Sequence, residues 1–334
     1  MEKFRKNYGI VGLCVVVVAY IIYNIPFLSL PYYWDEAWSY IPAVEEMVSK
    51  GSSMLPGSIS VASYKGHPLF FYFISSVWLQ LFHNNIFWSK CLALIISVFT
   101  LLYTFLLAKF LTRKDIAALL SVIYLASQDI FLAQSTMVLP EMLLALLSLM
   151  GLYYYFKNKF WIFFLSASLL MLTKETGIIL VISILFSDAL FFILEKKGNF
   201  RYYMVSRLPL YLAFIPVSLF FIYQKFKIGW FFYPEHIGYI DLSHNFFNKL
   251  NGYSSFLFLF QGRNIAFVFI LLLLLVKVIK NKRLKISKMW ATLLIFILFY
   301  LAFLSANFYS TRYILSLIPI FSILSLGDIC PSKK

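Results

Sequence analysis

The sequence has few charged residues and few of the residue types that build most soluble active sites. Only 13% of its 334 residues are charged, with 14 acidic side chains, four histidines and three cysteines. The cysteines (Cys14, Cys91 and Cys330) are isolated, so they indicate neither a disulfide framework nor a zinc motif. Because 62% of the residues are hydrophobic and the mean hydropathy is +0.83, an ordinary soluble domain is excluded and a polytopic membrane protein is indicated.

The net charge of +15 does not indicate nucleic-acid binding. The basic residues form short clusters between apolar runs, and this is how cytoplasmic loops of membrane proteins are marked. We therefore expect membrane lipids, and no nucleic acid, among the partners.

Ten apolar runs predict membrane-spanning helices in an all-α fold. The first follows Lys3, Arg5 and Lys6 and lacks a small-residue cleavage site, so we interpret it as a retained anchor. We find no internal repeat and expect one domain over residues 1–334. The predicted spans are 9–30, 89–110, 115–132, 140–156, 160–173, 176–194, 208–226, 256–279, 289–305 and 313–327.

An eleventh apolar run, residues 68–82, decides the predicted topology. It is short for a span and fits an amphipathic or interfacial helix in the first outer loop. If it does not cross, most basic clusters fall on the cytoplasmic side, as the positive-inside rule requires. We then expect both termini in the cytoplasm of a multi-pass plasma or cytoplasmic membrane protein. The outer segments are 31–88, 133–141, 174–175, 227–255 and 306–312, with 31–88 and 227–255 capping the bundle.

Unusual polar residues collect on the predicted outer side. Charges at membrane depth are costly and usually face a cavity where they act. Each also has a plainer interpretation: Glu141 can offset a helix dipole, Lys174 and Glu175 can pair with each other, and Arg312 can extend to lipid headgroups. We assign no role to Asp188, Glu235 or His236. The candidate residues are Asp35, Glu36, Tyr64, Lys65, His67, Glu141, Lys174, Glu175, Arg312 and Tyr313.

The sequence also contains side chains that can bind a divalent metal. Asp35, Glu36, His67 and the Glu235–His236 pair have suitable side chains, but no spacing motif supports a site. We therefore predict no certain cofactor and no metal ligand.

Five short motifs in a fixed order resemble those of the GT-C-fold glycosyltransferases. The resemblance is greatest to the protein O-mannosyltransferase and aminoarabinose transferase group, polytopic enzymes that take a sugar from a polyprenyl monophosphate. It implies a sugar donor of that kind and an active site on the extracytoplasmic face. The motifs are W-D-E-A at 34–37, G-H-P-L-F-F-Y at 66–72, P-E at 140–141, L-T-K-E-T-G at 172–177 and T-R-Y-I-L-S-L-I-P at 311–319.

The resemblance implies roles for individual residues. Asp35 matches the acidic residue expected to be the catalytic base, and Glu141 matches a second acidic position, which we also expect to be catalytic. Lys174 and Arg312 match basic positions near the carrier phosphate. We expect the remaining candidates to contact substrate. The chain departs from the family pattern where Pro68 is followed by Leu69 and not by a second proline.

The predicted function is transfer of one sugar, with inversion, to an acceptor hydroxyl of a lipid, a glycan or a protein. A flippase or transporter for lipid-linked sugars is the alternative, because intramembrane charges around a polar cavity fit it too. A non-catalytic scaffold is a third class, but it does not require carboxylates beside basic residues on one face. Loss of turnover on substituting Asp35 would distinguish the enzyme from the scaffold.

Overall fold

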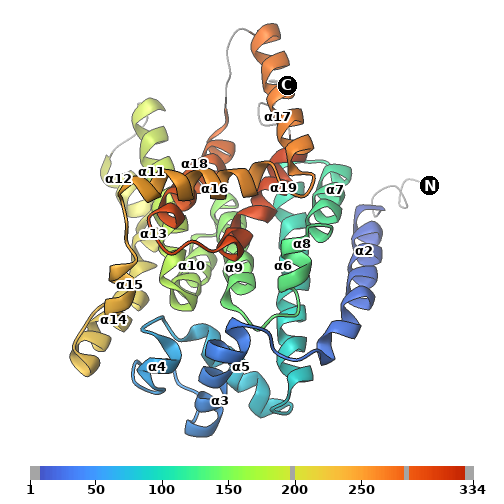
Figure 1. Cartoon of the computed structure of the whole chain (residues 1–334). Coiled ribbons are helices and arrows are strands. Elements are labelled where there is room, and N and C mark those ends of the chain that lie inside the picture. The colour runs from blue at the N-terminus through green and yellow to red at the C-terminus, as the bar shows by residue number, and fades with distance from the viewer. Residues whose placement is uncertain (1–7, 196–199, 282–285, 328–334) are drawn as a thin grey trace.

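The computed structural model describes residues 8–195, 200–281 and 286–327, and every regular element within these ranges is helical. The bundle is built from helices of unequal length, with α3, α4 and α5 grouped at one end (Figure 1). In chain order the first elements are α2 (Tyr8–Asn24), η1 (Ile25–Ser29), η2 (Glu36–Tyr40), α3 (Ile41–Lys50), α4 (Val61–Tyr64), α5 (Phe70–Leu81), α6 (Ile86–Thr112), α7 (Asp115–Ala126), α8 (Asp129–Gln134), α9 (Pro140–Phe156) and α10 (Phe160–Thr173). They are followed by η3 (Glu175–Gly177), α11 (Ile178–Glu195), α12 (Phe200–Ser206), α13 (Leu208–Leu212), α14 (Phe214–Ile228), α15 (Pro234–Gly238), α16 (His244–Phe258), α17 (Arg263–Asn281), α18 (Lys288–Ser305), η4 (Thr311–Leu317) and α19 (Ile318–Leu326).

Helices occupy all ten predicted spans, but the expected count of about ten crossings is not confirmed. Within the described residues, five helical stretches are long and apolar enough to cross a membrane, or six if one bent pair counts as a span. The helices at 115–126, 140–156, 160–173 and 311–326 are apolar but have only 10–17 residues. A helix rises 1.5 Å per residue, so such lengths fall short of a hydrocarbon core of roughly 30 Å.

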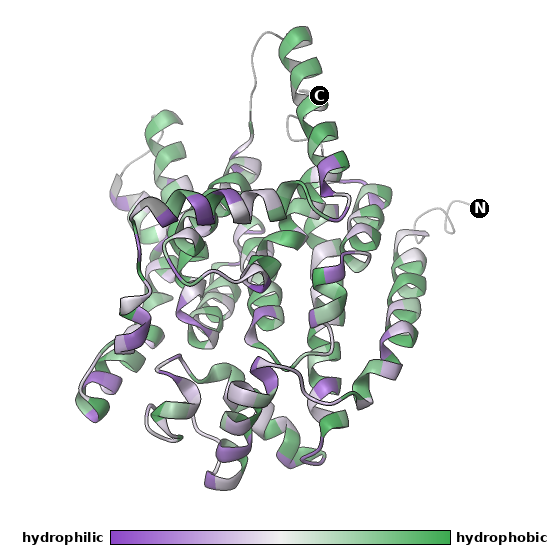
Figure 2. Cartoon of the chain, in the orientation of Figure 1, coloured by the Kyte–Doolittle hydropathy of each residue, from purple (hydrophilic) through white to green (hydrophobic). Residues whose placement is uncertain are grey.

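The apolar surfaces of α2 and α17 indicate an integral membrane protein. Hydrophobic residues run along α2 and α17 (Figure 2), and on α2 many of them face outward. Val15 and Ile22 are 64% and 62% exposed, as expected for side chains that contact lipid and not a protein core. The orientation of the two termini remains a prediction.

The predicted span 256–279 is wrong as one continuous helix. The chain breaks between α16 and α17, which are bent by 87°. Helix α16 ends at Phe258, and Gln261 and Gly262, which both have positive φ, turn the chain into α17 at Arg263. The buried guanidinium of Arg263 donates to the carbonyl of Phe256, satisfying a backbone group that the break leaves open. Consequently α16 lies across the bundle, within what was predicted to be largely an outer loop (Figure 1).

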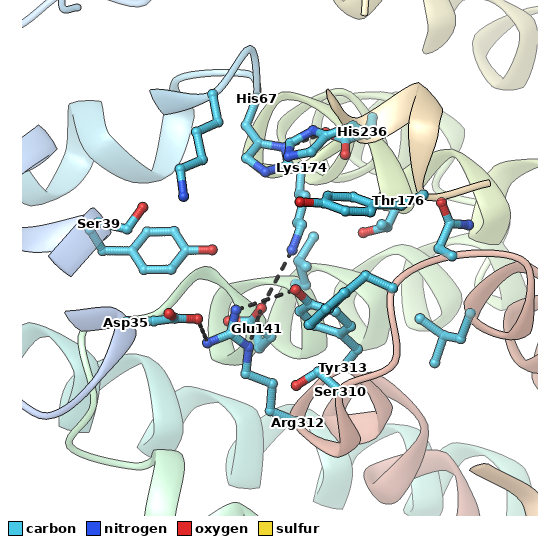
Figure 3. A pocket seen from close by; sticks show the side chains of 18 of the residues that line it. Asp35, Ser39, His67, Glu141, Lys174, Thr176, His236, Ser310, Arg312 and Tyr313 are labelled. Carbon is cyan, nitrogen blue, oxygen red and sulfur yellow. Dashed lines mark hydrogen bonds and ion pairs between the residues drawn. The ribbon is translucent and has the colours of Figure 1, made fainter. Parts of the chain in front are cut away.

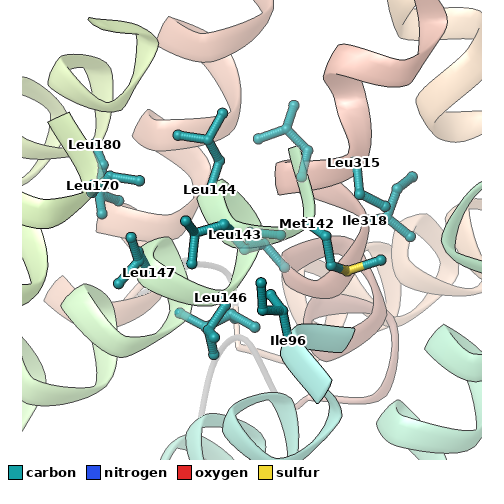
Figure 4. Close-up of a cluster of buried hydrophobic side chains, with 14 of the residues drawn as sticks. Ile96, Met142, Leu143, Leu144, Leu146, Leu147, Leu170, Leu180, Leu315 and Ile318 are labelled. Atoms are coloured by element: carbon teal, nitrogen blue, oxygen red, sulfur yellow. The ribbon is translucent and has the colours of Figure 1, made fainter. Parts of the chain in front are cut away.

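Helix α9 forms the centre of the core. Nearly all its residues are buried, as expected of a helix that is apolar on every side and covered by neighbours. Figure 4 shows its leucines, among them Leu143 and Leu147, between side chains of α6, α10, α11 and the η4–α19 segment. This packing fixes the first turn of α9, where Glu141 lies.

The apolar run 68–82 forms α5, a helix of 12 residues. It packs against α3, α6 and α10. At about 18 Å, it is too short to cross the hydrocarbon core, which agrees with the predicted non-crossing helix. Its placement at the membrane interface and the single-domain organisation remain predictions.

Candidate active site

One cavity of about 300 Å³ collects residues from segments far apart in the sequence. Its walls come from the end of η2 and the two residues before it, the turn after α4, the first turn of α9, the α10–η3 junction, α15 and the end of α18 with the start of η4 (Figure 3). Nine of the ten predicted site residues line it: Asp35, Tyr64, Lys65, His67, Glu141, Lys174, Glu175, Arg312 and Tyr313.

Local sequence explains how Glu141 reaches the cavity. Pro140 occupies the first position of α9, where a missing backbone N–H costs nothing, and its fixed φ favours helix initiation. Glu141 therefore lies in the first turn and is 2% exposed. In this first turn the Glu141 carboxylate can offset the helix dipole, as one interpretation of the sequence proposed. Its side chain also faces the cavity.

Lys174 and Glu175 are separated by a short extended step. Lys174 has φ −161° and ψ 143°, so adjacent side chains leave the backbone in different directions. Gly177 allows the sharp return, since a Cβ there would lie 2.7 Å from the Leu170 side chain. As a result Lys174 contacts Glu141, and Glu175 contacts His67.

Two carboxylates and two cations form a connected charge network in the cavity. Arg312 forms an ion pair with Asp35, and its Nε lies 3.6 Å from Oε1 of Glu141. Nζ of Lys174 lies 3.5 Å from the same oxygen. Both cations also approach the ring of Tyr313, at 4.4 Å for Lys174 and 5.0 Å for Arg312.

Glu141 has an unusual position in this network. Within the described residues, neither of its carboxylate oxygens accepts a hydrogen bond, although both are buried. Nε of Arg312 likewise has no hydrogen-bond partner there. Buried polar atoms are normally paired, so these groups are available to a polar ligand that enters the cavity.

Two histidines and a glutamate form a second cluster in the same cavity. Nδ1 of His67 lies 2.9 Å from Oε2 of Glu175, and the His67 and His236 rings are 4.7 Å apart. Burial, and secondarily the neighbouring His67, lower the pKa of His236 to about 4. One ligand atom from each of the three residues lies within 4.8 Å of the others. These donors suit a divalent transition metal, but Asp35 and Glu36, which the sequence offered as ligands, are not members.

Glu36 is the exception among the predicted substrate-binding residues. It is fully buried and is not among the described residues that line the cavity. Its carboxylate pairs with Lys90 and accepts backbone hydrogen bonds from Tyr33 and Val138. It borders a smaller, separate cavity of about 270 Å³.

Several lining residues were missed at the level of sequence, most of them because they lie outside the short motifs. Glu235 and His236 were noted but given no role, and both line the cavity. Asp188, also without an assigned partner, is buried elsewhere and pairs with Arg207 and Lys288. The other lining residues without a predicted role include several polar ones and a few apolar ones: Ser39, Tyr40, Tyr72, Thr176, Tyr239, Tyr300, Asn307 and Ser310, with Leu144, Phe303, Leu304 and Phe308.

Known proteins share the fold and part of the sequence. The family model described as dolichyl-phosphate-mannose-protein mannosyltransferase matches residues 66–223, a little less than half of the chain. A sequence comparison with curated proteins gives no match. The crystal structure of ArnT from Cupriavidus metallidurans bound to undecaprenyl phosphate superposes with a TM-score of 0.72 at 15% identity, over 96% of this chain and 60% of that one. The apo structure of the same protein gives 0.68 at 16% identity, over 95% and 59%.

The present chain therefore spans about 60% of the length of ArnT. At this identity the superposition establishes the fold, while the family match includes the segments that carry His67, Glu141 and Lys174. The resemblance of this chain to the GT-C-fold glycosyltransferases that use polyprenyl-phosphate sugars is thus confirmed by both its sequence and its fold.

Proposed function

We propose that this protein is a membrane glycosyltransferase that moves one sugar from a polyprenyl monophosphate carrier to an acceptor hydroxyl. The observation that carries the proposal is the charge network of Asp35, Glu141, Lys174 and Arg312 in one cavity. The undecaprenyl phosphate bound to ArnT, which has the same fold, supports a carrier of this chemical class.

The cations suit the phosphate end of the donor. Arg312 offers a planar fork of donors to phosphate oxygens, and the Lys174 ammonium adds a second positive charge. Since the phosphate gains negative charge as the sugar departs, fixed cations stabilise the transition state more than the ground state. In the structure these groups pair with carboxylates, so phosphate binding would exchange one anion for another.

Asp35 suits the role of base. Its side chain is 34% exposed, whereas that of Glu141 is 2% exposed, so an incoming acceptor reaches Asp35 more readily. The acceptor oxygen would bond to the anomeric carbon as the bond from that carbon to the phosphate oxygen breaks. The hydroxyl proton would pass to Asp35, and the bond electrons would leave with the phosphate. Attack opposite the phosphate inverts the anomeric centre.

Aromatic side chains in the cavity suit a sugar. Trp34 and Tyr64 line it, and Tyr72 and Tyr239 add further rings. Such rings present apolar faces and polar edges to a sugar. The acceptor is a lipid, a glycan or a protein hydroxyl, and the distribution of basic residues favours the extracytoplasmic side for the reaction.

The His67–Glu175–His236 cluster borders the same cavity. If it holds a divalent cation, the ion adds positive charge near the donor. The proposed transfer does not depend on that ion.

Single-turnover transfer tests the proposal. Purified wild type, Asp35→Asn and the control Asp241→Asn would be placed in lipid nanodiscs. They would receive labelled polyprenyl-phosphate sugars and a membrane extract as the acceptor source. Asp241 is a suitable control because its carboxylate, in the second large loop, caps Ser243 and is not among the described cavity residues.

We expect label to leave the carrier with wild type and Asp241→Asn, and to stay on it with Asp35→Asn. Equal transfer by all three would remove Asp35 as base. Donor that crosses the bilayer with its sugar–phosphate bond intact would support the flippase instead.

A further inference from the structure

The buried carboxylate of Glu36 connects the two segments that carry the candidate catalytic carboxylates. One oxygen accepts a hydrogen bond from the backbone N–H of Tyr33, at 3.1 Å. The other accepts from the backbone N–H of Val138, at 2.7 Å. Asp35 lies between Tyr33 and Glu36, and Glu141 follows Val138 by three residues. A single side chain therefore fixes both segments.

Lys90 provides the charge that lets this carboxylate remain buried. Its Nζ lies 3.4 Å from Oε1 of Glu36 and 3.3 Å from the carbonyl oxygen of Thr136. The two side chains are 4% and 1% exposed. A buried ion pair requires good hydrogen bonds to remain stable, and here they come from the backbone of both catalytic segments. Lys90 belongs to α6, so this set of contacts among Glu36, Lys90 and the backbone of Tyr33, Thr136 and Val138, called the Glu36 junction below, also includes α6.

The backbone conformation just before Asp35 explains why the Glu36 hydrogen bond to Tyr33 is needed. Trp34 has φ of +46°, a left-handed conformation that is uncommon for a bulky residue. Such a conformation persists only where neighbouring interactions hold it. The Glu36 side chain holds it by reaching back over Trp34 to the N–H of Tyr33, and this turn directs Asp35 toward Arg312 and the cavity.

We propose that Glu36, with Lys90, is a positioning residue that holds Asp35 and Glu141 in register across the cavity, and that it does not bind substrate. This inference rests on the proposed glycosyltransferase function. It predicts that loss of the junction lowers turnover while the donor still binds, because the phosphate contacts come from Lys174 and Arg312.

Two readouts test the proposal with Glu36→Gln, Lys90→Met and Lys90→Arg in nanodiscs. The matched control is Glu46→Gln, since Glu46 is a carboxylate of the same loop that accepts hydrogen bonds from Ser60 and Ser63, all within that loop. The first readout, amide hydrogen exchange by mass spectrometry, needs no substrate. The second is the steady-state rate of sugar transfer.

In Glu36→Gln and Lys90→Met, we expect exchange to accelerate together in peptides covering 32–40 and 134–141. Lys90→Arg should retain protection in both peptides, and Glu46→Gln should leave the 134–141 peptide unchanged. Unchanged exchange in that peptide with Glu36→Gln would overturn the proposal, whatever the enzyme does. This arm therefore stands even if wild type transfers no sugar, which would refute only the proposed function.

In the rate measurement, we expect kcat to fall by about 10–100-fold in Glu36→Gln, because small misplacement of reacting groups is costly. The KM for donor should change by less than about twofold, and Lys90→Arg should restore most of kcat. A raised KM with unchanged kcat would instead make Glu36 a substrate-binding residue and contradict the proposal.

Discussion

Arg312 is the side chain whose substitution best tests the arrangement of the cavity. It contacts Asp35 through one nitrogen and lies 3.6 Å from Glu141 through another. A lysine has the same charge but only one ammonium, so it cannot maintain both contacts or grip a phosphate with two parallel hydrogen bonds. Arg312→Lys thus removes the two-point contact of the guanidinium but keeps the positive charge, whereas Arg312→Met removes both the contact and the charge.

The expected magnitudes follow from these contacts. Loss of one fixed donor to developing charge typically costs about 10²–10³ in rate, or roughly 2.7–4 kcal/mol. We therefore expect kcat/KM to fall by about 10²-fold in Arg312→Lys and further in Arg312→Met. Removing one partner of a buried ion pair destabilises a protein by about 3–5 kcal/mol. Arg312→Met should lose less than this, because Lys174 still lies 3.5 Å from Glu141.

The assay is transfer from a labelled polyprenyl-phosphate sugar, together with thermal unfolding in nanodiscs. Arg263→Lys is the control, since Arg263 is a buried arginine that supports the α16–α17 break and is not among the described cavity residues. It should lower the Tm and leave the kcat/KM of the folded enzyme close to wild type. If Arg312→Lys keeps kcat/KM within about threefold of wild type, less than 1 kcal/mol, the proposed role of Arg312 is wrong.

Three further predictions concern segments that the sequence predicts to lie on the outer side of the membrane. Gly66→Ala should destabilise the protein by about 1–3 kcal/mol, because Gly66 has φ of +73° and a Cβ there would lie 2.7 Å from Trp230. Thermal unfolding measures this change, and an unchanged Tm would contradict the prediction. Burial alone would raise the pKa of Glu46, but hydrogen bonds from the lysine and serines around it lower that pKa from 4.5 to about 2. The stabilisation that the Glu46 carboxylate gives to the first loop is therefore fully present above pH 4.5 and lost as the pH falls toward 2. Amide hydrogen exchange of residues 44–64 in wild type should accelerate over that pH window. An exchange rate that does not change with pH in this window, beyond the intrinsic pH dependence, would contradict the prediction. Zinc should bind to metal-free His236→Ala with at least about tenfold lower affinity than to metal-free wild type. Competition with a chelator measures the two affinities. Equal affinities would exclude the His67–Glu175–His236 cluster as the binding site.

Adjacent residues show where sequence reasoning could not reach. Asp35 and Glu36 form one acidic pair in the sequence, yet the first lines the cavity and the second is buried beside Lys90. Lys174 and Glu175 were open to pairing with each other, but each contacts a partner far away in the chain. Side-chain direction depends on local backbone angles and on the packing of distant helices, and neither is written in a short motif.

The broken helix shows the same limit for the fold. The run 256–279 is apolar enough to suggest one span, but the break at 259–262 is stabilised by Arg263, whose side chain donates to Gln128 in the connection between α7 and α8. Hydropathy adds up residues independently, so it cannot include a contact between segments 135 residues apart.

The sequence by itself determined the membrane class, the helical character and most of the charged residues that meet in the cavity. Hydrophobic runs and basic clusters are local properties, and the cost of charge in lipid makes unusual polar residues visible without a structure. Only the tertiary structure decided which charges meet. The energies of the Arg312–Asp35 pair and of the Glu36 junction depend on distances across the bundle, and those distances arise only when the helices pack.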